Sequence, residues 1–228
     1  MPSPPPLKPY VVVVTGMAFE AGIAAGPGIV VVTGGAANVD AISAAVRRGC
    51  RGIISFGIAG GLTPELKSGA CIVARSIVTG DRRYHSHREW FDRLRAAIPG
   101  SIHADIAGAE TPVCSPGDKR KMAVATGAVA VDMESAGSAI AAFKHKLPFA
   151  ALRVVADPSH RSLPPAALSE RHIDGTTNLS AVLRSIVAQP SQLGGLLRLA
   201  LDTRTARAAM VRSRRRLGHG FGLISQAS

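Results

Sequence analysis

The chain has 228 residues, of which 46% are hydrophobic, and its formal net charge is +12. This length accommodates one α/β domain with an extension, and this apolar fraction excludes a generally disordered chain. No run of about 18 apolar residues occurs, so we expect no membrane-spanning helix. The N-terminal segment lacks the pattern of a secretory signal, and three cysteines are too few for a disulfide framework. We therefore expect a cytoplasmic protein with reduced thiols.

Short apolar segments alternate with helical patterns along the chain. Where β-branched and other apolar residues cluster, we expect strands over 10–15, 28–33, 51–58, 71–79, 129–132 and 149–155. Apolar residues at helical spacing predict helices over 39–48, 89–98, 119–126, 135–145, 178–189 and 193–216. Apolar strands separated by helices predict a three-layer αβα fold with a central mixed, largely parallel β-sheet.

The charge divides the chain into three parts: a Pro-rich leader over 1–9, a domain over 10–189 and a basic C-terminal helix or tail over 190–228. The last part carries seven arginines and one acid, which is half of the net charge. One interpretation is a terminal helix docked on the core with a solvated basic end. The other is peripheral contact with the inner membrane surface, where arginines meet anionic headgroups. Aromatic residues are scarce and do not alternate with these arginines, so we expect no nucleic acid.

Four segments place glycines or an acid where a predicted strand ends, which is where open α/β sheets bind ligands. Each also has a structural interpretation: a helix-terminal or loop acid, a tight turn, or a cap. The segments are 15–20 with Glu20, the glycine-rich 55–64, 131–136 with Glu134, and 153–158 with Asp157.

Together these segments resemble one family, the purine nucleoside phosphorylases and methylthioadenosine/adenosylhomocysteine nucleosidases. The resemblance covers about 11–189 and is carried, in the family's order, by Gly57-Ile58-Ala59-Gly60-Gly61-Leu62, Leu66-Lys67-Ser68-Gly69, Arg83-Tyr84-His85, Met133-Glu134 and Asp157. Within the family, the composition and the Arg-rich end are most similar to the hopanoid-associated branch, which is thought to release adenine from adenosylhopane.

The resemblance implies a role for each matched residue. Asp157 would be the general acid at the purine N7, Glu134 would accept hydrogen bonds from the ribose hydroxyls, and Glu20 would orient or deprotonate the attacking water. The matched substrate-binding residues are Met133 under the sugar, Ala59 and Gly60 in the glycine-rich segment, Thr111 and Val113 in the base pocket, and Tyr84 and His85 near the 5′ side and a subunit interface. A homo-oligomer is implied, and no metal or organic cofactor is expected.

These residue types suit the reaction independently of the family. Cleavage of an N-glycosidic bond produces an oxocarbenium-like sugar and an anionic purine. A general acid that protonates the purine improves the leaving group by a factor of about 10²–10⁴. One carboxylate can stabilise the developing sugar cation while a second activates water. The acid must keep its proton near neutral pH, which requires burial or a nearby like charge.

Departures from the family pattern bear on the reaction and the substrate. Ala156 stands where the family often has Ser, and Ala70 where it often has Asp. Ser55 and Ile58 stand where some phosphorylases hold phosphate with Arg and Ser, which favours hydrolysis. Inorganic phosphate as co-substrate would then have to be held by the backbone of Thr33, Gly34 and Gly35, by Ser55, or by arginines elsewhere. Only 13 residues separate Glu20 from Gly34.

The family usually has a longer segment between these two positions. The shorter segment of this chain would leave the 5′ side of the sugar pocket open to a bulky group such as a hopane skeleton. Three functional alternatives remain: a phosphate-dependent phosphorylase, a general methylthioadenosine/adenosylhomocysteine nucleosidase, and a non-catalytic nucleoside-binding protein with a basic membrane-associating tail.

Overall fold

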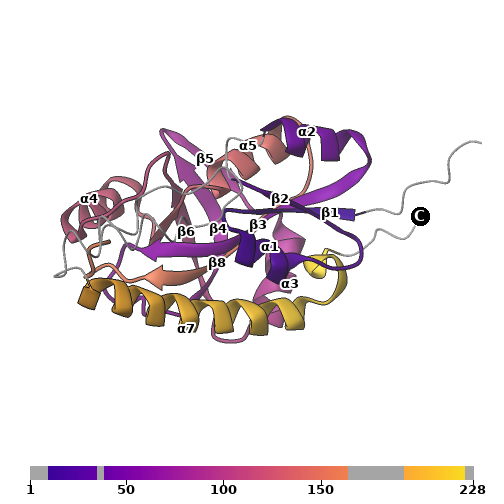
Figure 1. Ribbon diagram of the computed structural model, residues 1–228. Helices are drawn as coiled ribbons and strands as arrows, with labels where there is room; N and C mark the ends of the chain where they lie inside the picture. The colour runs from indigo at the N-terminus through magenta and orange to yellow at the C-terminus, as the bar shows by residue number, and fades with distance from the viewer. Residues whose placement is uncertain (1–9, 35–38, 164–192, 224–228) are drawn as a thin grey trace, which may run out of the picture.

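A computed structural model describes residues 10–34, 39–163 and 193–223 (Figure 1). It confirms the predicted α/β fold, with a mixed sheet covered by helices. In chain order, the elements are β1 (Tyr10–Thr15), α1 (Ala18–Ala24), β2 (Ile29–Thr33), α2 (Val39–Arg47), β3 (Cys50–Gly61), β4 (Cys71–Thr79), β5 (Arg82–His85), α3 (Arg88–Ala97), β6 (Ile102–Gly108), α4 (Pro116–Thr126), β7 (Ala130–Asp132), α5 (Ser135–Lys144), β8 (Phe149–Asp157), α7 (Leu193–Leu217) and the 3₁₀ turn η4 (His219–Gly222).

The sheet is organised around the long strand β3. The strand order is β2-β1-β3-β7-β6-β4-β5, and β8 pairs with both β3 and β4. Three pairs are parallel: β1 with β2, β1 with β3, and β3 with β8. Two pairs are antiparallel: β4 with β8, and β3 with β7. The pairings therefore run in a closed circuit through β3, β8, β4, β6 and β7, which brings the ends of β3, β7 and β8 together.

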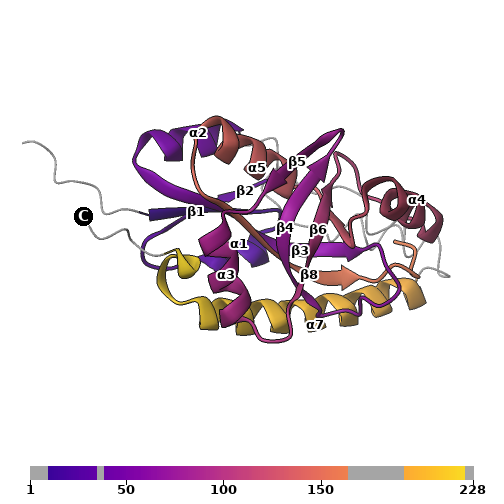
Figure 2. The ribbon, with the colours of Figure 1, turned by 180° about the vertical axis from the view of Figure 1, so that it is seen from behind.

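Two hydrophobic cores lie on opposite faces of the sheet. On one face, Ile42 of α2 and Ala139 and Ala142 of α5 pack on alternate residues of the strands. On the other face, α1, α3 and α7 cover the sheet through residues that include Trp90 and Met210. Figures 1 and 2 show α2 and α5 together on one side and α3 and α7 on the other. Helix α4 lies apart from both layers and packs on the ends of β6 and β7.

Helix α7 is docked along the sheet, as the first interpretation of the basic end expected. Ala206, Ala209, Met210 and Leu217 are buried at helical spacing, whereas Leu197, Leu201 and most of the helix's arginines are exposed. Within the described residues, no helix combines the length and the apolar character that crossing a bilayer requires. The expected helix over 178–189 and the leader over 1–9 lie outside the described residues.

Several predicted boundaries were close, and four elements were not expected. Helix α4 begins at Pro116 rather than at 119, because Ser115 Oγ accepts a hydrogen bond from the Asp118 amide and caps it. Helix α1, strands β5 and β6 and the 3₁₀ turn η4 were not expected. The segment over 55–64, expected to be a strand up to 58 followed by a glycine turn, is instead extended up to Gly61, with an irregularity at Ala59/Gly60 where β3 moves from β8 towards β7.

Candidate active site

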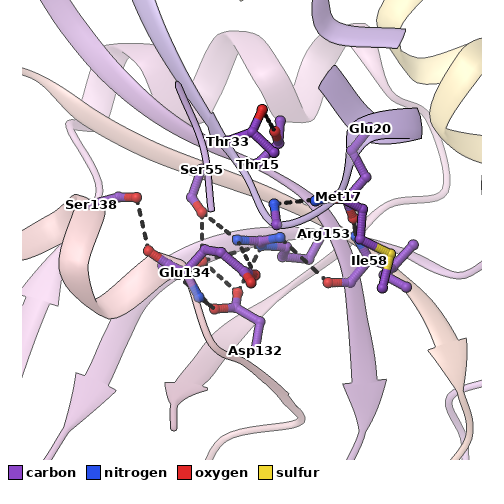
Figure 3. A network of polar contacts seen from close by, with 12 residues as sticks. Thr15, Met17, Glu20, Thr33, Ser55, Ile58, Asp132, Glu134, Ser138 and Arg153 are labelled. Atoms are coloured by element: carbon purple, nitrogen blue, oxygen red, sulfur yellow. Dashed lines mark hydrogen bonds and ion pairs between the residues drawn. The ribbon is translucent and has the colours of Figure 1, made fainter. Parts of the chain in front are cut away.

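Arg153 is the centre of a buried polar network (Figure 3). Its side chain comes from β8 and is fully buried, and its Nε lies 2.7 Å from Asp132 Oδ2. Its Nη2 lies 3.3 Å from Glu134 Oε2 and donates to the Ser55 hydroxyl. Burial lowers the pKa of Arg153, but Asp132, Glu134 and Glu20 outweigh this effect and raise it above its ordinary value. The guanidinium is therefore a permanent cation that holds acids from separate elements together.

The turn from β7 into α5 positions Glu134. Asp132 Oδ1 accepts hydrogen bonds from the Glu134 amide at 3.0 Å and from the Ser135 amide at 2.7 Å. These are backbone donors at the start of α5, so Asp132 both caps the helix and binds Arg153. Glu134 occupies the N-cap position of α5, and its side chain is 12% exposed. The Glu134 carboxylate is thus fixed at the mouth of the network rather than sealed inside it.

Glu20 is buried on α1, with a relative exposure of 1%. Its carboxylate accepts backbone hydrogen bonds from Gly16 at 2.8 Å, Met17 at 2.9 Å and Ile58 at 2.7 Å. Burial raises the pKa of Glu20, while Arg153 and these three N–H donors act in the opposite direction. A carboxylate with a raised pKa is a better proton acceptor than an exposed one, which is the property that a general base requires.

Two glycines allow these acids to approach the backbone closely. A Cβ atom at Gly57 would lie 2.4 Å from Arg153 Nη1 and 2.5 Å from Glu20 Oε1. A Cβ atom at Gly16 would lie 2.4 Å from Glu134 Oε1. No side chain fits at either position without displacing these groups. Glycine is therefore required at position 57 because no room remains for a side chain beside Arg153 and Glu20, and not because the backbone adopts a turn conformation that only glycine accepts.

Asp157 lies at the end of β8, four residues beyond Arg153, where the pairing register of β8 with β3 shifts and Asp157 pairs with Gly60. Its nearest cation is Lys119 of α4, whose Nζ lies 2.6 Å from Asp157 Oδ2. Burial raises the pKa of Asp157, while Lys119, Arg161 and His160 act against the rise. A raised pKa lets this carboxyl group carry a proton at higher pH than an exposed aspartate does, which suits a general acid.

The other residues expected at the site fall into two groups. Ser55 lies at the network, and Met133 lies in the chain between Asp132 and Glu134. Ala59 and Gly60 are on β3, where Gly60 pairs with Asp157. Gly34 follows β2, and its amide donates to the Thr15 carbonyl; Gly35 lies outside the described residues. Thr111 is exposed in the loop after β6, and Val113 packs on the core beneath α4.

Tyr84 and His85 lie away from the acids. The Tyr84 ring packs edge-to-face on Phe143 in the last turn of α5, with ring centroids 5.7 Å apart. Glu134 is at the opposite end of this helix, which is about 15 Å long. Tyr84 and His85 instead line a surface groove of about 730 Å³ between β5 and α5, together with Phe143 and Lys146.

Sequence reasoning selected the three acids as candidates but not the groups that contact them in the structure. It named Arg153 as a potential cation for Asp157, whereas the structure directs Arg153 to Asp132 and Glu134. It gave no role to Lys119, and none of its own to Asp132. An available signal was that Asp132 is the last residue of a short apolar strand, as Asp157 is. Within the described part of the chain, no group of three or more His, Cys, Asp or Glu side chains could hold a metal ion.

The fold and the site define a class: an α/β protein with buried acids at the ends of sheet strands. Residues 6–188 match the Phosphorylase superfamily, and the chain belongs to this family. Membership supports an enzyme that cleaves nucleoside glycosidic bonds. No curated protein matches the chain significantly.

Solved structures share the fold at low sequence identity. The 5′-methylthioadenosine/S-adenosylhomocysteine nucleosidase of Campylobacter jejuni is 14% identical, with a TM-score of 0.64 over 91% of this chain and 97% of that one. The nucleosidase of Colwellia psychrerythraea in complex with adenine is 18% identical, with a TM-score of 0.62 over 79% and 95%. Futalosine hydrolase of Helicobacter pylori is 17% identical, with a TM-score of 0.60 over 79% and 97%.

Proposed function

We propose that this protein hydrolyses the N-glycosidic bond of a purine nucleoside and releases adenine. The observation that carries the proposal is the convergence of Glu20 and Glu134 on Arg153, with the buried Asp157 four residues farther along β8. These acids come from three separate elements and are held in defined positions, which is the arrangement that positioned acid–base catalysis requires.

Each acid has one task in this reaction. Asp157 donates its proton to N7 of the purine while the electron pair of the C1′–N9 bond passes into the ring. Glu134 accepts hydrogen bonds from the ribose hydroxyls and stabilises the positive charge that develops on the sugar. Glu20 takes a proton from the water whose oxygen bonds to C1′. The products are adenine and the free sugar; Glu20 then releases its proton to solvent, and Asp157 regains one from solvent.

The electrostatics of the network favour water over phosphate as the nucleophile. Three carboxyl groups, Asp132, Glu134 and Glu20, surround the single guanidinium of Arg153. A phosphate dianion placed beside them would meet a surplus of negative charge. The Ser55 hydroxyl is engaged with Arg153, and the Gly34 amide with the Thr15 carbonyl.

For the 5′ substituent, we propose the bulky lipid group of adenosylhopane. The support is the short connection after Glu20: α1 ends at Ala24 and β2 begins at Ile29. A short connection leaves less chain to close over the 5′ side of a bound sugar. The proposal fails if the purified protein cleaves 5′-methylthioadenosine far faster than adenosylhopane.

Product analysis tests the reaction class. The full-length protein is incubated with adenosylhopane in isotope-labelled water, with and without inorganic phosphate. Hydrolysis places the label on the released sugar and does not depend on phosphate, whereas phosphorolysis gives a sugar 1-phosphate. We expect Asp157→Asn to lower kcat by a factor of about 10²–10⁴, and the exposed Glu65→Gln to leave it unchanged. Tight nucleoside binding without any adenine release would favour a binding protein instead.

A further inference from the structure

Lys119 is a buried cation in α4 with three acceptors and no exposed surface. Its side chain is 0% exposed, and Nζ donates to Asp157 Oδ2 at 2.6 Å, to the Pro158 carbonyl at 3.0 Å and to the Arg161 carbonyl at 2.9 Å. Burying an ammonium group is costly unless it is paired and fully hydrogen-bonded. An apolar side chain could fill the same volume without that cost, so the charge at this position needs an explanation beyond packing.

The chemistry of the ammonium group determines which Asp157 oxygen can carry a proton. A protonated lysine offers three donors and no acceptor. Nζ donates a hydrogen bond to Oδ2, so a proton on Oδ2 would point at the N–H of Lys119 and could not form a hydrogen bond with it. The neutral form of Asp157 therefore carries its proton on Oδ1, the oxygen that Lys119 does not contact.

We propose that Lys119 is the positioning residue of the general acid: it holds Oδ2 of Asp157 and leaves Oδ1 as the oxygen that delivers the proton to the purine. This proposal rests on the proposed function. In the chemical step the Oδ1–H bond breaks, a bond from that hydrogen to N7 forms, and the C1′–N9 electron pair enters the ring. The resulting carboxylate is stabilised by the hydrogen bond from Lys119.

The remaining charged groups near Asp157 are weaker candidates for this role. Arg161 and His160 follow β8 and act on the Asp157 carboxyl group only through their charge. The Arg161 guanidinium is itself paired with Asp202 of α7. On the strand beside Asp157, Gly60 offers no side chain. Among the described residues, Lys119 is the side chain with a hydrogen bond to Asp157.

Two substitutions separate the charge of Lys119 from its hydrogen bonds. Lys119→Met removes both, whereas Lys119→Gln keeps a neutral donor. We expect Lys119→Met to raise the pKa of Asp157 by about 1–3 pH units, to move the alkaline limb of kcat/KM to higher pH by the same amount, and to lower kcat about three- to thirtyfold with little change in KM. Lys119→Gln should raise the Asp157 pKa while losing less of kcat. Lys121→Met is the matched control, because Lys121 lies on the same helix and its side chain is 84% exposed.

Titration of Asp157 provides a readout that does not depend on turnover. Carbon NMR of isotope-labelled aspartate, assigned with Asp157→Asn, follows the carboxyl group directly, and the Lys119 Nζ resonance of the wild-type protein should shift at the same pH. If both lysine variants fail to fold, this titration of the wild-type protein still tests the proposal. A Lys119 Nζ chemical shift that does not change at the pH where Asp157 titrates overturns it. In an Asp157→Asn background, Lys119→Met should have no further effect on kcat, and an additive loss also overturns it. A wild-type protein that releases no adenine refutes the proposed function, while the coupled titration still tests the control of Asp157 by Lys119.

Discussion

Substitution of Gly57 by alanine perturbs the network with a single methyl group. Gly57 lies on β3, and it is not among the residues with positive φ, so its backbone conformation accepts alanine. The new Cβ would lie 2.4 Å from Arg153 Nη1 and 2.5 Å from Glu20 Oε1. Ordinary contacts are about 1 Å longer. Either β3 moves away from β8, or the two charged groups separate from their partners.

The expected cost follows from this overlap. Overpacking of a well-packed interior costs about 1–3 kcal/mol, which is roughly a five- to 150-fold change in the unfolding equilibrium constant. Neither side chain can swing away freely, because Glu20 is held by three backbone amides and Arg153 by two carboxylates. A displacement of about 1 Å in a catalytic group can also lower kcat about 10²-fold. We therefore expect Gly57→Ala to lose both stability and activity.

Urea unfolding and adenine release measure the two effects, with Gly60→Ala as the control for stability. Gly60 is on the same strand, but a Cβ there would meet its nearest atom, Val131 Cγ1, at 3.4 Å. The midpoint of unfolding should fall for Gly57→Ala and change little for Gly60→Ala, with equal m-values. If both variants are as stable as the parent protein, the tight approach of Glu20 and Arg153 to β3 is wrong.

Three further substitutions probe the charges and the core. Arg153→Met should destabilise the protein by about 3–5 kcal/mol at neutral pH, because it leaves buried carboxylates without a cation; the deficit should shrink in acid, and a deficit independent of pH would contradict this. Because burial raises the native pKa of Glu20 above 4.5, the stability that its protonation contributes is present below pH 4.5 and is lost as pH rises through the native value; Glu20→Gln should remove this slope from urea unfolding measured across that range. Trp90→Phe should cost about 1–3 kcal/mol in urea unfolding, since the buried Trp90 Nε1 donates to the Phe221 carbonyl at 2.7 Å; a smaller loss would mean that this bond adds little to the docking of η4.

Most of the fold could be predicted because its signals are local. Runs of β-branched residues gave β1 and β4 at their observed bounds, and the helix over 193–216 was one residue short of α7. The missed elements have weak local signals. Strand β6 interrupts its apolar residues with His103 and Asp105, and α1 is a seven-residue helix with a glycine inside it. Their conformations are decided by pairing and packing against distant segments.

The candidate site could be predicted only in part, for the same reason. Glu20, Glu134 and Asp157 each follow a predicted strand, so the rule that ligands bind at the ends of strands was enough to select them. Their partners obey no such local rule. Lys119 reaches Asp157 across 38 residues of sequence, and Arg153 lies inside a strand that reads as wholly buried. A buried cation is not visible in a pattern of apolar residues until the acids around it are known.

The alanine that precedes Asp157 illustrates how the two kinds of information combine. In the sequence, Ala156 indicates that an orienting hydroxyl is missing next to the acid. In the structure, Ala156 packs in the core beneath α7. The donor to Asp157 comes instead from Lys119, a charged group on another element. Because a charge-assisted hydrogen bond is stronger than one from a neutral hydroxyl, the substitution at 156 does not leave the acid unsupported. The hydrogen bond that orients Asp157 comes from Lys119 of α4, which packs at the ends of the strands, and not from the residue that precedes Asp157 in the sequence.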